Sequence, residues 1–332
     1  MESTRRRSTR RQRALRAGGV AAALSGAFLA VLVAEARFAY ATINAVDLIP
    51  PPDPTGTYGA DGPRADEPPI TVALLGDSSA AGYGLEAASE TPGALLGQGV
   101  ASWSGRRVNL RDLAVVGALS SDLDIQVDRA LAHEPDVAVI LVGANDVTHL
   151  VRPSVSSGHL VRAVEKLRAG GVAVLVGTVP DLGSIKPVLP PLRHLARAWS
   201  RRIAAEQTIR AVGAGARSVS LADILGPEFT ANRDFLFGPD KFHPSTAGYA
   251  ALAEVLLPST LAALGLLGDE QAELATYRGE HALPIAAAAL RAVNTPGTEL
   301  GPVAKPRGRL GRIWVRVAKR PRVVRRARAR RP

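Results

Sequence analysis

The chain has 332 residues, of which 46% are hydrophobic and 21% are charged, and it contains no cysteine. The hydrophobic fraction is large enough for a packed core, which excludes a wholly disordered chain. Without cysteine, disulfide bonds, zinc sites with cysteine ligands and a thiol nucleophile are excluded as well.

The formal net charge of +11 is concentrated at the two ends of the chain. Seven arginines lie in residues 1–16, and thirteen lysines or arginines lie in residues 305–331. Residues 17–304 hold 21 basic and 29 acidic side chains, so this central part carries a net charge of −8. A groove that binds nucleic acid is normally positive and belongs to the folded body, so we expect no nucleic-acid partner.

An uncharged apolar run, Ala17–Ala34, follows the basic N-terminus. As a helix it would cover most of a hydrocarbon core about 30 Å thick. The preceding arginines favour a cytoplasmic position for residues 1–16. We therefore predict a signal-anchor over residues 17–40, which makes the protein a single-pass protein of the cell membrane with its main domain outside the cytoplasm. The alternative is a signal peptide cleaved after Ala39-Tyr40-Ala41, which would release a secreted protein.

Seven prolines lie between residues 44 and 69, three of them consecutive. This composition is typical of a stiff, extended chain, so we predict a linker over residues 41–69.

From residue 70 onward, short apolar runs alternate with segments of helical spacing. The runs are mostly continuous, as in parallel strands that are buried on both faces. The expected strands are Ile70–Leu75, Val108–Val115, Val137–Val142, Val172–Val179 and Ser218–Leu221. The expected helices cover residues 92–103, 120–132, 158–169, 192–212 and 245–264. This order predicts an α/β domain over residues 70–265, a three-layer α/β/α sandwich with a mostly parallel five-stranded sheet.

The chain beyond this domain is less regular. Residues 266–304 form a C-terminal extension, in which an alanine-rich stretch near residues 280–293 is expected to add a helix. Residues 305–332 are arginine-rich and are expected to be a disordered basic tail. The alternative for this tail is contact of its few apolar side chains and its cations with anionic lipid.

A serine follows the first expected strand in the run Gly76-Asp77-Ser78. A hydroxyl at such a strand-to-loop turn is raised over the sheet edge, and its backbone N–H is free to donate, which suits a nucleophile. Taken alone, the same residues also make an ordinary turn.

Two further polar groups follow the next two strands. Gly117 can bring its backbone N–H close to a substrate oxygen, although a lone glycine is also a common turn residue. Asn145 carries a side-chain N–H donor suited to developing negative charge, and the adjacent Asp146 caps a helix or holds the loop.

The run Asp240-Lys241-Phe242-His243 precedes the last expected helix. The spacing lets the Asp240 carboxylate reach one imidazole nitrogen of His243, which leaves the other nitrogen for Ser78. Alone, the run would merely end a loop. Because these motifs follow one another at strand ends and supply a nucleophile, oxyanion donors and an acid–base pair, we expect one active site.

These motifs resemble the SGNH or GDSL-like hydrolases over about residues 70–265. Gly76-Asp77-Ser78 is similar to the first sequence block of that family, Gly117 to the second, Gly143-x-Asn145-Asp146 to the third and Asp240-x-x-His243 to the fifth. The runs Gly-Asp-Ser-Ser-Ala-Ala-Gly and Gly-Ala-Asn-Asp-Val-Thr-His are most similar to actinobacterial exported or membrane-anchored members. Ser79 departs from the leucine in the family name and leaves the nucleophile in place.

The resemblance implies a flavodoxin-like fold and ester hydrolysis without a metal or a cofactor. The expected enzyme is a serine esterase with Ser78, Asp240 and His243 as catalytic residues and with Ser78, Gly117 and Asn145 as the oxyanion hole. The expected partners are an ester of the lipid or acylated-glycan type and, through residues 17–40, the membrane. Two alternatives remain: an O-acyltransferase that uses the same serine, and a non-catalytic module that binds the membrane surface through its basic ends. The oligomeric state is open.

Overall fold

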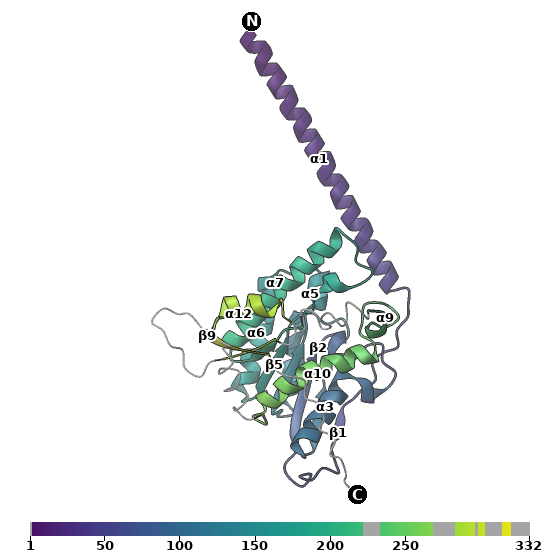
Figure 1. Cartoon of the computed structure of the whole chain (residues 1–332), viewed down its shortest axis with the longest axis vertical. Helices are drawn as coiled ribbons and strands as arrows, with labels where there is room; N and C mark the ends of the chain where they lie inside the picture. The colour runs from purple at the N-terminus through teal and green to yellow at the C-terminus, as the bar shows by residue number, and fades with distance from the viewer. Residues whose placement is uncertain (1, 222–232, 268–282, 296–297, 303–313, 320–332) are drawn as a thin grey trace.

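The computed structural model of the protein describes residues 2–221, 233–267, 283–295, 298–302 and 314–319 (Figure 1). One long helix, α1 (Glu2–Ile43), leads from the N-terminus to a body built around a single sheet. Within the described residues, the sheet has nine strands in the order β1-β3-β2-β4-β5-β6-β8-β9-β7.

Five neighbouring strands in the middle of this sheet are parallel and occur where the apolar runs predict them. They are β2 (Ile70–Gly76), β3 (Val108–Asp112), β4 (Val137–Leu141), β5 (Ala173–Gly177) and β6 (Arg217–Val219). Counted along the chain, their order across the sheet is 2-1-3-4-5, which is the order of flavodoxin-like folds. The predicted α/β class is therefore confirmed. In such sheets ligands bind where the order reverses, here between the carboxyl ends of β2 and β4.

Helices cover both faces of the parallel strands. Along β2, Ala73 and Leu75 pack toward one layer, and the alternate residues Val72 and Leu74 pack toward the other. The first layer contains α4 (Leu123–Leu131) and α6 (Pro153–Ala169), with α7 (Leu192–Gly213) against α6. The second contains α3 (Pro92–Ser104) and α10 (Thr246–Ala263). Burial of both faces explains why the strands read as continuous apolar runs.

The proline-rich segment does not form the predicted linker along its whole length. β1 (Gly56–Tyr58) pairs antiparallel with β3 at the edge of the sheet. Pro54 is buried, and its carbonyl accepts a hydrogen bond of 2.6 Å from the Tyr58 hydroxyl. The prediction was wrong here because β3 offers an open strand edge, which Thr57 and Tyr58 suit by their strand propensity.

The C-terminal extension adds antiparallel strands to the other edge of the sheet. α12 (Ile285–Ala292) lies within the expected alanine-rich helix, and β8 (Thr298–Pro302) pairs with β6. Residues 314–319, expected in the disordered tail, form β9 (Trp314–Lys319) between β8 and β7 (Leu283–Pro284). Val315 and Val317 favour a strand despite the surrounding cations. The remainder of the expected tail lies outside the described residues.

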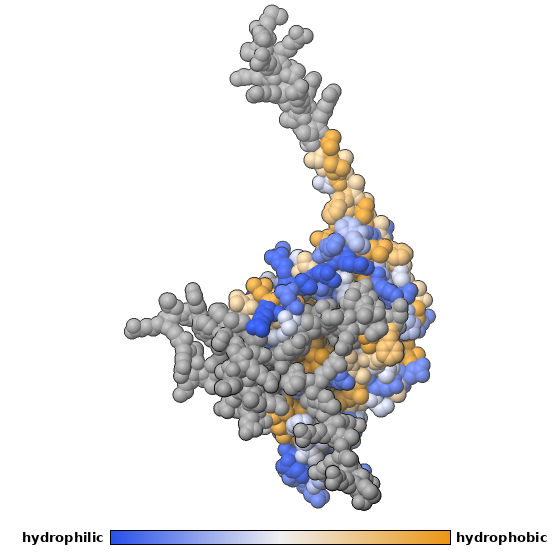
Figure 2. All heavy atoms as spheres, in the orientation of Figure 1, coloured by the Kyte–Doolittle hydropathy of each residue, from blue (hydrophilic) through white to orange (hydrophobic). Residues whose placement is uncertain are grey.

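The N-terminal helix contains one segment that is long and apolar enough for a membrane anchor or a signal sequence. The most apolar 18 residues of this segment, Gly18–Ile43, have a mean hydropathy of 1.9 and make no buried contact with the body. Figure 2 shows it as a hydrophobic rod that projects from the mixed surface of the domain.

Asp112, at the end of β3, is expected to make stability depend on pH. Burial and the nearby Asp53 raise the pKa of the Asp112 carboxyl to about 7, while its Oδ1 accepts a hydrogen bond from the Ala114 N–H. Between the unfolded pKa of 3.8 and about 7, the folded chain binds more protons than the unfolded chain, so stability falls as pH rises. Asp112→Asn keeps the acceptor and removes this titration. We expect a flatter dependence of Tm on pH between pH 5 and 8.

Thermal unfolding of the detergent-solubilised chain, followed by circular dichroism, measures this effect. Asp61→Asn, at an exposed position, serves as the control. An unchanged pH dependence in Asp112→Asn would contradict the assignment.

Candidate active site

The turn after β2 holds Ser78 at the carboxyl edge of the sheet. Gly76 has φ +141°, and a Cβ atom there would lie 1.8 Å from the Leu141 carbonyl oxygen of β4, so only glycine allows this approach. Asp77 then caps the short helix α2 (Ser78–Ala81) by accepting a hydrogen bond of 2.9 Å from the Ser79 N–H. Ser78 is thus the first residue of a helix, and its own N–H has no intrahelical acceptor.

Ser78, His243 and Asp240 form one chain of hydrogen bonds. The Ser78 Oγ lies 3.0 Å from the His243 Nε2, and the His243 Nδ1 lies 2.6 Å from the Asp240 Oδ2. The other carboxylate oxygen of Asp240 accepts the backbone N–H groups of Phe242 and His243, both at 3.0 Å. The spacing of the Asp-x-x-His run therefore directs one imidazole nitrogen to the carboxylate and the other to the serine.

The charge state of Asp240 follows from these contacts. Burial alone would raise the pKa of its carboxyl, but the hydrogen bonds from His243 and from the Phe242 N–H outweigh burial and hold the pKa below its usual value. An ionised Asp240 requires the proton of a neutral His243 to lie on Nδ1. This leaves Nε2 as an acceptor for the Ser78 hydroxyl proton.

Aromatic rings and a buried hydroxyl hold His243 and the Ser78 turn in place. Tyr83 and Phe242 meet the imidazole edge-on, with ring centroids 5.0 and 4.7 Å from that of His243. The fully buried Tyr249 donates to the Tyr83 carbonyl at 3.1 Å. Burial raises the pKa of Tyr249 well above its usual value, so its hydroxyl stays a donor. Sequence reasoning did not identify Tyr249 or Tyr83.

Gly117 lies on the loop that follows β3, and Asn145 lies close to it on the short helix that follows β4. Asn145, in α5 (Ala144–Thr148), donates one N–H of its side chain to the Ala118 carbonyl at 2.9 Å. Gly117 is exposed and has φ +85°, with open space where a Cβ atom would lie. In the described part of the chain neither residue hydrogen-bonds to Ser78.

Asp146 joins three segments around this loop. Its buried carboxylate accepts the N–H of Ser120 at 3.2 Å and the hydroxyls of Ser120 and of Ser156, the latter at 2.7 Å. Ser120 begins η2 (Ser120–Asp122), which follows the Gly117 loop, and Ser156 lies in α6. Asp146 therefore holds the loop, one of the two roles that the sequence left open for it.

Two buried glutamines, which sequence reasoning missed, hold the ends of the strands that carry the site. Gln126 of α4 accepts the Gly76 N–H at 2.7 Å and donates to the Gly76 carbonyl at 3.0 Å. Gln207 of α7 accepts the Val179 N–H at 2.8 Å and donates to the Val142 carbonyl at 2.9 Å. In the sequence, each of these glutamines is recognisable only as a polar residue at helical spacing among the apolar residues of a buried helix face.

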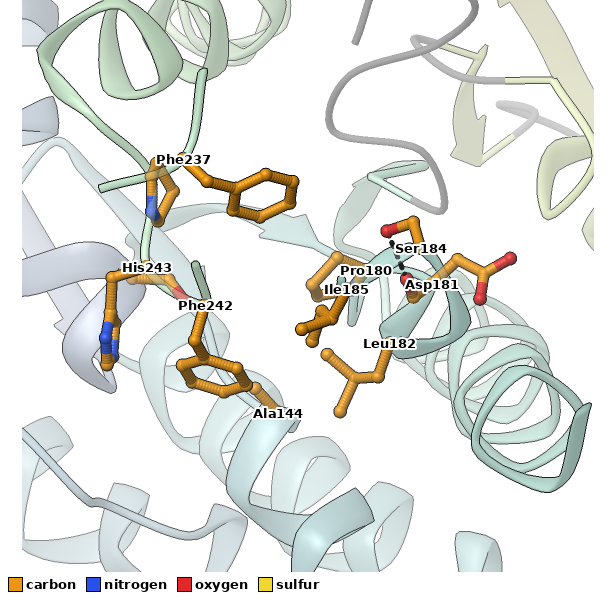
Figure 3. Close-up of a pocket in the computed structure, with 11 residues that line it drawn as sticks. Ala144, Pro180, Asp181, Leu182, Ser184, Ile185, Phe237, Phe242 and His243 are labelled. Atoms are coloured by element: carbon orange, nitrogen blue, oxygen red, sulfur yellow. Dashed lines mark hydrogen bonds between the residues drawn. The ribbon is translucent and has the colours of Figure 1, made fainter. Parts of the chain in front are cut away.

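An apolar pocket opens beside His243. Its lining includes Leu182 of η3 (Leu182–Ser184), together with Ile185, Phe237 and Phe242. Figure 3 shows these side chains directed toward a common space, with His243 at its edge. On the other side of His243, a more polar depression is lined by residues that include Leu48, Tyr83 and Glu90. Within the described residues, no group of three His, Asp or Glu side chains could hold a metal ion.

Comparison with known proteins shows the family to which the chain belongs. The model of the GDSL-like Lipase/Acylhydrolase family matches residues 74–251. The GDSL-like esterase Rv1075c of Mycobacterium tuberculosis is 38% identical over 254 residues, which make up 73% of this chain and 81% of that protein. The chain therefore belongs to the GDSL-like lipase/acylhydrolase family, as the motifs indicated, and it is an ester hydrolase.

Two solved structures are similar to part of this chain. The alignment with TesA covers 58% of this chain and 99% of the TesA chain, with a TM-score of 0.48 and 24% identity. The alignment with the psychrotrophic esterase EstA from Pseudoalteromonas sp. covers 59% of this chain and 98% of the EstA chain, with a TM-score of 0.48 and 21% identity.

Removal of the Gln126 amide should destabilise the fold next to the site. Gln126→Leu leaves the buried Gly76 N–H without its side-chain acceptor, which costs about 1–3 kcal/mol of the free energy of unfolding. Gln98→Leu makes the same change on an exposed face of α3 and should have little effect. Chemical denaturation of both variants measures the difference, and equal stabilities would contradict the role of Gln126.

Proposed function

We propose that this chain hydrolyses carboxylic esters through a Ser78-His243-Asp240 triad and an acyl-enzyme intermediate. The observation that carries the proposal is the continuous hydrogen-bond chain from the Ser78 Oγ through both imidazole nitrogens to the Asp240 carboxylate. Nucleophile, base and orienting carboxylate are then in contact before a substrate binds.

In the first half-reaction, the His243 Nε2 takes the Ser78 hydroxyl proton while the Ser78 Oγ attacks the ester carbonyl carbon. The ionised Asp240 stabilises the imidazolium that forms. Collapse of the tetrahedral intermediate breaks the bond to the alcohol oxygen, which receives the proton from His243. In the second half-reaction, His243 takes a proton from water, and the water oxygen attacks the acyl carbon. The carboxylic acid leaves, and the proton returns to Ser78.

The oxyanion of each tetrahedral intermediate is assigned to three donors: the backbone N–H groups of Ser78 and Gly117 and the side chain of Asn145. The Ser78 N–H is at the start of α2 and has no intrahelical acceptor, which supports the first assignment. The contact of Asn145 with Ala118, next to Gly117, supports a common position for the other two donors.

The substrate is an ester of a lipid or of an acylated glycan. The apolar pocket next to His243 suits the acyl group, because its lining includes Leu182, Ile185, Phe237 and Phe242. We assign residues 17–40 to a membrane anchor with the hydrolase domain outside the cytoplasm, on the basis of the exposed apolar helix and the arginines before it. A hydroxyl acceptor in place of water would make the same site an acyltransferase.

A fluorophosphonate probe tests the nucleophile, because it reacts with a serine hydroxyl only where that hydroxyl is activated. We expect the probe to label the wild-type chain and Ser79→Ala, and to leave Ser78→Ala unlabelled. Ser79 is the matched control because it adjoins Ser78 in the same turn. Mass spectrometry of the labelled protein gives the result, and a folded wild-type chain that stays unlabelled would overturn the triad.

Asn145→Ala tests the oxyanion hole separately. Loss of one such donor typically lowers kcat about 10²–10³-fold, so this variant should be impaired and still measurable. Asn109→Ala, at the amino end of β3, makes the same change away from the site and should retain its rate. Steady-state hydrolysis of p-nitrophenyl acetate measures both variants. Full activity in Asn145→Ala would exclude this role.

A further inference from the structure

The membrane-directed helix is attached to the body at one defined place. The Glu35 Oε2 of α1 accepts the Leu192 N–H at the start of α7, at 2.9 Å. Four residues further on, Ala39 is buried against the body. A carboxylate at the N-terminus of a 22-residue helix is favoured by the unpaired N–H groups and by the helix dipole. The end of α1 is therefore docked on the body.

The docking place adjoins the depressions on the two sides of His243, which we call the active-site mouth. Arg197 and Arg201, in the first half of α7, pair with the buried Asp181 at 3.0 and 3.5 Å. Asp181 directly precedes η3, whose residues line the apolar pocket. Leu48, five residues after the end of α1, lines the depression on the other side of His243. Figure 1 shows α1 meeting the body at the end where α5, α7 and α9 (Arg233–Leu236) lie.

The first charged residue after the apolar run of α1 sets the level of the bilayer surface. The uncharged run Ala17–Ala34 is 18 residues long, and Glu35 follows it. A helix of that length covers about 27 Å, close to the thickness of the hydrocarbon core. Since Glu35 also contacts Leu192, the start of α7 lies at the bilayer surface whenever α1 spans the membrane.

Apolar side chains are exposed at this end of the body. We define the rim as Leu150, Leu189, Leu195 and Phe235, whose exposed fractions are 74%, 43%, 47% and 70%. All four lie on segments that follow the carboxyl ends of the parallel strands. Lys186 and Lys241 accompany Phe235 around one depression, while Glu86 and Glu90 lie in the depression beyond His243. Apolar side chains with nearby lysines are typical of a surface that enters a lipid interface.

We propose that the active-site mouth faces the bilayer that holds α1 and that the rim contacts this bilayer. The substrate is then an ester carried by a membrane lipid, whose acyl group reaches the apolar pocket from the interface. This inference rests on the proposed function and narrows it from lipid or glycan esters to esters at the membrane. The bond broken is the ester C–O bond, and water is the second reactant, as in the mechanism above.

The orientation can be measured without activity, because the chain has no cysteine of its own. The full chain carrying Leu195→Cys, Phe235→Cys or Trp103→Cys is labelled with bimane and reconstituted into phosphatidylcholine–phosphatidylglycerol vesicles. Trp103 is 46% exposed and lies near the end of α3, toward the amino ends of the parallel strands and away from the active site. It serves as the control. Headgroup-nitroxide lipids should quench the labels at positions 195 and 235 several-fold more than the label at 103. Equal quenching at all three positions would overturn the inference.

A rate ratio tests the substrate class in the same vesicles. We compare hydrolysis of a long-chain ester embedded in the bilayer with hydrolysis of p-nitrophenyl acetate in solution. Phe235→Ser should lower the ratio of membrane to soluble rates several-fold, and Trp103→Ser should leave this ratio unchanged. Hydrolysis of the soluble ester alone would overturn the inference and leave the proposed function standing. Hydrolysis of neither ester would overturn the proposed function, and the quenching would still report the orientation.

Discussion

The hydrogen bond between Ser78 and His243 is the contact on which the account of this protein depends. It joins residues 165 positions apart at 3.0 Å, so the two segments that carry them must be placed accurately by the rest of the fold. The parallel sheet provides most of that accuracy, because Ser78 lies two residues after the end of β2 and the Gly76 backbone lies against β4. A side chain on Gly76 would force these two strands apart at the point where the strand order reverses.

Buried polar side chains complete the positioning of the site. Gln126 and Gln207 each bond to one N–H and one carbonyl group near the strand ends, where the sheet no longer pairs all of its backbone groups. Asp146 connects the Asn145 loop to the Gly117 loop and to α6. Buried polar groups are costly without partners, so each of these networks favours one arrangement of its loops. Buried residues that do not face the substrate therefore fix the positions of the active-site residues.

Much of this arrangement could be predicted from the sequence. The five continuous apolar runs predicted the parallel strands, because residues buried on both faces leave a pattern that needs no knowledge of the partner strands. The motifs predicted the proximity of Ser78, Asp240 and His243, because parallel strands bring their carboxyl ends to one edge. Asp240 and His243 are three residues apart, so a local turn settles their contact.

The remaining features depend on long-range pairing that local patterns do not contain. β1 was read as linker because prolines dominate the segment around it, residues 44–69, while its pairing depends on the open edge of β3. β9 was read as tail because the surrounding residues 305–331 are rich in arginine, while its strand depends on β8. In the sequence Gln126 cannot be distinguished from other polar helix residues, because its partner, the Gly76 backbone, lies 50 positions away. Contacts of this kind decide the edges of the sheet and the support of the site.

The most direct test of the central claim is to identify the residue that carries the acyl group during turnover. The wild-type chain is mixed with a p-nitrophenyl ester, quenched in acid within the first turnover and digested for peptide mass spectrometry. We expect one acylated peptide, with the acyl group on Ser78, formed together with a burst of p-nitrophenol. An acyl group on Ser79 or another residue, or turnover without any acylated peptide, would contradict the account.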